Sequence, residues 1–92
     1  MADTPKYRIR LRWQVAELLD MSGAEFLGRR TNGKWNLYEV DARTLQLLIR
    51  ETHRLGFTER LPGTVDHDRL REAFHHLRRV LTAGPIEEVR NG

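Results

Sequence analysis

The sequence predicts an α+β fold in which a short antiparallel sheet packs against two longer C-terminal helices. Two stretches, residues 6–13 and 34–40, have the alternation or the aromatic and β-branched content that is typical of strands. Two later stretches, residues 42–55 and 65–83, repeat apolar residues at helical spacing. A chain of 92 residues has room for one modest core, so we expect a single domain.

The first predicted strand alternates basic and apolar residues without exception across residues 6–13. Because successive side chains of a strand point to opposite faces, one face is apolar and the other carries a row of guanidinium groups. That basic row either contacts phosphate groups or keeps a solvated edge strand from pairing with other chains. The apolar face consists of Tyr7, Ile9, Leu11 and Trp13, and the basic face of Arg8, Arg10 and Arg12.

Residues 14–31 support two hypotheses. On the first, residues 15–19 form a short helix, residues 20–22 form a tight turn, and residues 23–31 form a second helix. On the second, residues 24–31 form a strand, which gives a three-stranded β-meander of residues 7–13, 24–31 and 34–40 without a helix-turn-helix. Alternation through residues 15–19 would place Glu17 on the apolar face, which favours the first hypothesis. The Asn32-Gly33 pair predicts a chain reversal on either hypothesis.

The two C-terminal helices have recognisable ends. Asp41 is a suitable N-cap for the helix over residues 42–55, and Gly56 is a suitable C′ residue. Thr64 or Asp66 caps the helix over residues 65–83, after a loop whose turn is Pro62-Gly63, and Gly84-Pro85 ends it. Residues 1–5 and 86–92 are predicted to be loose tails. Residues in the middle of the apolar stripes should be buried, namely Leu48, Leu70, Phe74 and Leu77.

The formal net charge is only +3, but the basic residues are unevenly distributed. Residues 6–34 carry seven basic and three acidic residues, and residues 69–79 carry four and one. Fourteen of the sixteen basic residues are arginine, whose planar fork suits phosphate and guanine. The chain has no cysteine, no apolar run long enough to span a membrane and no apolar core of a signal peptide near its start. We therefore expect a cytoplasmic protein without a membrane partner.

Catalytic and metal-binding motifs are missing from the sequence. Ser22, the only serine, has no glycine-flanked nucleophile motif around it, and no histidine pair has the spacing of a zinc-binding helix. Glu72 and His76 stand four residues apart and are better explained as a solvated helix pair than as metal ligands. We expect no enzymatic activity, no cofactor and no bound metal.

A helix-turn-helix needs a small residue in its first helix, an apolar residue and a cap in its turn, and an inward apolar residue in its second helix. Ala16, Met21-Ser22 and Phe26 match these requirements in order. Residues 14–48 resemble the winged helix-turn-helix proteins that include phage excisionases and MerR-type regulators. The resemblance implies a small DNA-binding protein, either a transcriptional regulator or a recombination-directionality factor.

On this hypothesis the second helix enters the major groove and its polar residues contact bases. The resemblance thus assigns base contacts to Glu25, Arg29 and Arg30, and phosphate contacts to Lys34, Arg8, Arg10 and Arg12.

Two alternatives remain open. The second hypothesis for residues 14–31 fits a protein-binding module, such as an antitoxin, an adaptor or a phage-encoded inhibitor, and a second copy of the chain is among its candidate partners. The same sheet also fits an RNA-binding surface, with Trp13, Trp35 and Tyr38 as stacking platforms.

Overall fold

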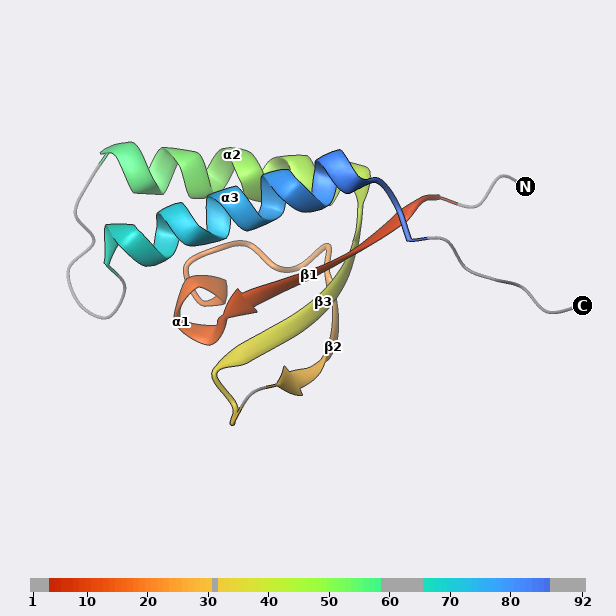
Figure 1. Ribbon diagram of the computed structural model, residues 1–92, viewed down its shortest axis with the longest axis horizontal. Helices are drawn as coiled ribbons and strands as arrows, with labels where there is room; N and C mark the ends of the chain where they lie inside the picture. Colours follow the sequence, from red (N-terminus) through yellow and green to blue (C-terminus); the bar gives the residue numbers. More distant parts are fainter. Residues whose placement is uncertain (1–3, 31, 59–65, 87–92) are drawn as a thin grey trace, which may run out of the picture.

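The computed structural model describes residues 4–30, 32–58 and 66–86. It confirms the predicted α+β fold, with a three-stranded antiparallel sheet and two longer C-terminal helices. Figure 1 shows α2 and α3 lying side by side above the sheet, with the short α1 near one end of β1. The elements are β1 (Lys6–Arg12), α1 (Trp13–Ala16), β2 (Glu25–Arg30), β3 (Trp35–Asp41), α2 (Ala42–Thr58) and α3 (His67–Ala83).

The strand order of the sheet is β1-β3-β2, so the third strand of the sequence lies in the middle. β3 pairs with β1 from Lys6↔Asp41 to Arg12↔Trp35, and with β2 from Glu25↔Glu39 to Arg30↔Trp35. The β-meander would have placed β2 in the middle and is therefore wrong in its strand order. β1 and β2 run parallel to each other on opposite edges of β3, connected by α1 and the loop after it.

The helices cover one face of the sheet, and the core lies between the two layers. The predicted alternation of β1 is confirmed, because its apolar residues Tyr7, Ile9 and Leu11 are all buried. On β3 the buried residues are Asn36, Tyr38 and Val40, which pair with those of β1 on the same face. The helices, α1 and the loop after it complete the core with Val15, Ala16, Leu19, Leu45, Leu48, Ile49, Leu70, Ala73 and Leu77.

Residues 25–30 form a strand, so the helix predicted over residues 23–31 is wrong. Gly28 adopts φ +127°, which lies outside helical geometry, and the register shifts by one residue between Phe26 and Gly28. The strongly β-forming segment β3 offers a complete hydrogen-bonding edge to residues 25–30. A short glycine-containing helix has no stabilisation comparable to that pairing.

The segment before β2 does contain a short helix, as the first hypothesis predicted, but α1 spans residues 13–16 and not 15–19. Its Val15 and Ala16 are buried, whereas Glu17 is exposed. The chain then turns where the backbone N–H of Ser22 donates to Oδ1 of Asp20, 3.1 Å away. Because no second helix follows, α1 packs on the core instead of supporting a helix-turn-helix.

The turn between β2 and β3 confirms the prediction for Asn32-Gly33. Asn32 has φ +56° and Gly33 has φ +76°, positive values that asparagine and glycine accept more readily than other residues. Asp41 caps α2 as predicted, because its Oδ1 accepts a hydrogen bond of 2.7 Å from the backbone N–H of Thr44. That bond lowers the pKa of the Asp41 carboxyl group.

Two helix ends differ from prediction by a few residues. α2 continues through Gly56 to Thr58, since Gly56 lies against Leu70 of α3 and packing there sustains the helix. Of the two predicted caps, Asp66 caps α3, accepting from the backbone N–H of Arg69 at 2.9 Å. Gly84 ends α3 at φ +96°, as predicted. The predicted turn at Pro62-Gly63 lies outside the described residues.

The predicted core residues Leu48, Leu70 and Leu77 are buried, but Phe74 is only partly buried. Phe74 lies at the outer seam between α2 and α3, in ring contact with His53 at 5.2 Å. Trp13 is half-buried and begins α1 instead of ending the strand. Ile86, predicted to belong to a loose tail, donates its backbone N–H to the Lys6 carbonyl group at 2.7 Å. The predictions for residues 1–3 and 87–92 lie outside the described residues.

Candidate functional site

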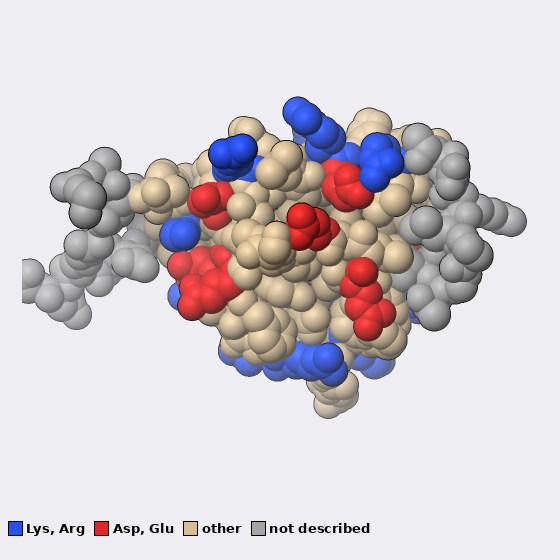
Figure 2. All heavy atoms as spheres, turned by 180° about the vertical axis from the view of Figure 1, so that it is seen from behind, with Lys and Arg blue, Asp and Glu red and all other residues tan. Residues whose placement is uncertain are grey.

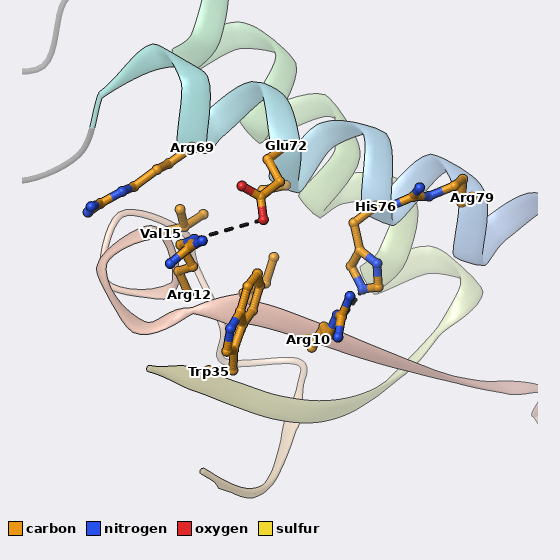
Figure 3. A pocket seen from close by; sticks show the side chains of 10 residues that line it. Arg10, Arg12, Val15, Trp35, Arg69, Glu72, His76 and Arg79 are labelled. Carbon is orange, nitrogen blue, oxygen red and sulfur yellow. Dashed lines mark hydrogen bonds and ion pairs between the residues drawn. The ribbon is translucent and has the colours of Figure 1, made fainter. Parts of the chain in front are cut away.

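A small pocket with a cavity volume of about 30 Å³ lies where α3 passes the edge strand β1 (Figure 3). Four of the described residues that line it are arginines, and one is acidic. We call this pocket and its rim the basic groove, formed by Arg10, Arg12, Trp35, Arg69, Glu72, His76 and Arg79.

The sheet side of the basic groove is a stack of three side chains. Arg10 and Arg12 point to the same face because they are two residues apart on β1, and Trp35 is the β3 partner of Arg12. The Cζ atoms of Arg10 and Arg12 lie 5.1 Å and 4.6 Å from the centroid of the Trp35 ring. Figure 3 shows the indole ring between the two arginine side chains. Cation–π attraction therefore holds both guanidinium groups beside the pocket.

The helix side of the basic groove comes from one face of α3. Arg69, Glu72, His76 and Arg79 recur every three or four residues, so they share a face of the helix. That face adjoins the buried stripe of Leu70, Ala73 and Leu77, whose packing fixes α3 against β1. The position of the basic side chains thus follows from the hydrophobic packing of the same helix.

Arg12 has an incomplete set of partners. Its Nε atom lies 3.8 Å from Oε1 of Glu72, an ion pair that is too long for a hydrogen bond. The same Nε atom is buried and has no hydrogen-bond acceptor among the described residues. A buried donor without an acceptor is costly. One carboxylate among four guanidinium groups leaves the groove positively charged.

His76 connects the two sides of the groove. Its Nε2 atom accepts a hydrogen bond of 3.1 Å from the backbone N–H of Arg10, an edge-strand donor that faces away from β3. Burial lowers the pKa of His76, as do the positive charges of Arg10 and Arg79, while Glu72 opposes the shift. The neutral imidazole is the form that can accept this bond.

The face of the sheet turned away from the helices, the open face, continues from the groove. It consists of three rows that cross the strands. The row at the hairpin end has an arginine on each side of an apolar centre, and the next row has an arginine on one side and a glycine on the other. The third row contains two glutamates. Arg8 is paired with Glu39 at 3.8 Å, so it adds little net charge. From the hairpin end the rows are Arg12–Trp35–Arg30, Arg10–Leu37–Gly28 and Arg8–Glu39–Glu25.

The structure separates the residues predicted to contact DNA. Because residues 25–30 are a strand, Glu25 and Arg30 lie on the open face and Arg29 projects to the other side, so the three do not form one base-contacting surface. The predicted inward Phe26 is 54% exposed. Lys34 is exposed beside the hairpin turn. Of the predicted set, those that converge around Trp35 are Arg10, Arg12 and Arg30.

Sequence reasoning did not include the α3 residues Arg69, Glu72, His76 and Arg79 in the site. The excess of basic residues between positions 69 and 79 was visible in the sequence, and their spacing already defined one helical face. Their alignment with β1 depends on tertiary packing, which no local pattern reveals.

The side of the molecule opposite that seen in Figure 1 has a mixed charge distribution. Figure 2 shows acidic side chains over the middle of that face and basic ones along its upper and lower margins. The lower margin is level with β2 and the β2–β3 turn in Figure 1, where Arg29, Arg30 and Lys34 are exposed.

Within the described ranges, no cluster of three or more histidine, aspartate or glutamate residues could hold a metal ion. In the same residues, no helix is both long enough and apolar enough to cross a membrane. The fold and site define a small α+β domain with a basic groove beside an open sheet face. Comparisons of the chain with family models, curated proteins and solved structures give no match.

Proposed function

We propose that the protein is a non-enzymatic nucleic-acid-binding domain whose basic groove and open face contact the phosphate backbone. The observation that supports this most directly is the convergence of Arg10 and Arg12 from β1 with Arg69 and Arg79 from α3. Arginine forks match the geometry of phosphate oxygens, and four of them around one carboxylate give a cationic site.

Two further features favour a polyanion over a single small anion. The positive charge does not end at the pocket, because Arg30 continues it across the sheet in the same row as Arg12 and Trp35. Exposed Lys34 adds a further cation beside the hairpin turn. An extended series of cations suits a chain of phosphate groups. The helix first expected to enter the major groove does not exist, so the proposed contacts come from the sheet and from α3.

Fluorescence-anisotropy titrations of labelled oligonucleotides at several salt concentrations test the proposal. The variants are Arg10→Ala and Arg79→Ala in the groove, with Arg71→Ala as control. Arg71 is an exposed arginine of the same helix that does not line the groove. Each groove substitution should flatten the slope of log K against log salt by about 0.7 to 0.9, and Arg71→Ala should leave it unchanged. Binding no tighter than about 10⁻⁴ M at physiological salt would contradict the proposal.

A second candidate function is protein–protein interaction, with a second copy of the chain as the partner. In the described part of the sheet, β2 pairs only with β3, so its outer edge is unpaired, and the adjacent Phe26 is 54% exposed. The strand begins with Glu25 and ends with Arg29-Arg30. Antiparallel association of two β2 edges would therefore bring opposite charges together at both ends.

Sedimentation equilibrium distinguishes this candidate. Glu25→Arg and Arg30→Glu should each weaken self-association, and the double charge exchange should restore it. A wild-type protein that stays monomeric at about millimolar concentration would exclude β2 pairing as a function.

A further inference from the structure

The centre of the open face is apolar, and its sides are cationic. β3 contributes Trp35 and Leu37 to the two rows nearest the hairpin, both half-buried, and β1 contributes the arginines beside them. On the β2 side, Gly28 has no side chain beside Leu37. The Arg30 Nη1 atom lies 3.3 Å from the point where a Gly28 Cβ would stand, so its guanidinium group extends over the glycine.

We propose that this face binds single-stranded nucleic acid, with a base stacked in the Arg12–Trp35–Arg10 stack and the adjoining phosphate in the basic groove. This inference rests on the proposed nucleic-acid-binding function and specifies its ligand.

The Arg12–Trp35–Arg10 stack is chemically suited to unpaired bases. Indole rings and guanidinium planes are the surfaces on which unpaired bases stack. Trp35 holds one guanidinium group at 4.6 Å and another at 5.1 Å from its ring centroid. A base can replace one of these groups on the indole ring, and the displaced arginine remains on β1 beside the groove, where it can contact a phosphate. The stack therefore provides a π surface for the base and a cation for the neighbouring phosphate.

A duplex is less well suited to the open face than a single strand. In a duplex the base faces are covered by their neighbours, so Trp35 and Leu37 would find no apolar partner and only the arginines would bind. Readout of a duplex through the major groove needs a helix or a two-stranded ribbon that can enter it. α3 cannot serve in this way with its groove-facing side, because that side packs along β1. A single strand can lie across the open face and present its bases to β3.

The Arg12 Nε atom is an unsatisfied donor beside the stack. It is buried at the junction of the stack and the groove and has no hydrogen-bond acceptor among the described residues. Displacement of Arg12 from the indole ring by a base would expose this donor to the adjoining phosphate. The buried donor thus favours a ligand that combines a flat ring with an anionic group.

Tryptophan fluorescence provides a direct test, because the chain has only two tryptophans. Trp13→Phe leaves Trp35 as the sole indole reporter. This variant is titrated with an oligothymidylate, an oligouridylate and a duplex of the same oligothymidylate with its complement. We expect quenching by the single strands and at least about tenfold weaker binding of the duplex. The oligothymidylate and oligouridylate arms show whether DNA or RNA is preferred.

Trp35→Leu and Trp35→Phe, compared by circular dichroism with wild type to establish folding, complete the test. Trp35→Leu should weaken single-strand binding by about 5- to 150-fold and weaken duplex binding by a smaller factor, whereas Trp35→Phe should keep most of the affinity. Equal affinity for single strand and duplex, without quenching of Trp35, would overturn this inference and leave the proposed function intact. Failure to bind either form would overturn both. The quenching experiment retains Trp35, so it tests this inference even if the Trp35→Leu variant folds poorly.

Discussion

Arg10 and His76, 66 residues apart in the sequence, are joined by a hydrogen bond of 3.1 Å from the backbone N–H of Arg10 to Nε2 of His76. The bond closes the outer edge of β1 at this point and fixes the helix side of the basic groove against the sheet side. It also makes the protonation state of one imidazole part of the structure of the groove.

The first prediction is that wild-type stability decreases as the pH falls below about 6.5, the ordinary histidine value. Because burial, Arg10 and Arg79 lower the folded-state pKa of His76, the unfolded chain takes up this proton at a higher pH than the folded one. The stabilisation is therefore complete above the unfolded-state pKa and is lost as the pH falls towards the folded-state pKa. Urea unfolding of wild type and His76→Gln measures it, since glutamine retains an acceptor and does not titrate. Equal pH dependence in the two proteins would contradict the prediction.

The second prediction is that oligonucleotide affinity increases as the pH falls, whereas stability decreases. A phosphate group in the groove raises the pKa of His76, so oligonucleotide affinity should increase as the pH falls from about 7.5 to about 5.5, within the range where the protein remains folded. The charged groups that face His76 are Arg10 on β1 and Glu72 and Arg79 on α3. Anisotropy titrations of wild type and His76→Gln measure the effect. If His76→Gln shows the same increase, the phosphate does not lie near this imidazole.

The third prediction separates two residues of the α3 stripe. Leu70 is fully buried, and Leu70→Ala should cost about 2–5 kcal/mol of unfolding free energy. Phe74 is only partly buried at the seam with α2, so Phe74→Ala should cost less than the roughly 3–5 kcal/mol typical of a fully buried phenylalanine. Chemical denaturation of both variants measures the difference. A larger loss of unfolding free energy for Phe74→Ala than for Leu70→Ala would contradict the prediction, because it would mean that another face of α3 packs on the core.

The fourth prediction tests the bulge in β2. Gly28 has φ +127°, where side chains are strained, and a Cβ atom there would lie 3.3 Å from Nη1 of Arg30. Gly28→Ala should cost more than about 1 kcal/mol. Gly33→Asn is the matched control, because Gly33 has φ +76° with open space around it, and asparagine accepts that conformation. Thermal unfolding temperatures that fall equally for the two variants would argue against the bulge.

The sequence contained enough information for the elements whose pattern is local. Strict alternation defined β1, apolar stripes defined α2 and α3, Asp41 identified the start of α2, and Asp66 was one of two candidate caps for α3. β2 was ambiguous, because residues 25–30 have no clear period and become a strand only through pairing with β3. The short α1 likewise depends on burial of Val15 and Ala16.

The candidate site was predictable only in part. The arginine row of β1 followed from its alternation, and the basic excess of α3 from composition. Their convergence on one groove depends on how α3 packs against β1, a relationship between residues about 60 positions apart. The position of Trp35 between Arg10 and Arg12 depends on the register of β3 against β1, which the sequence pattern does not specify.

The central claim is that nucleic acid binds on the open face and in the basic groove. The most direct measurement is an NMR titration of isotope-labelled wild-type protein with an oligothymidylate, followed through backbone amide, arginine Nε and indole Nε1 signals. The largest chemical-shift changes should occur at Arg10, Arg12 and Trp35 and at the groove face of α3 around His76. Changes should be small at the outer side of α2 around Leu47 and Arg50, which are both exposed. Changes confined to α2, or no changes at all, would contradict the account.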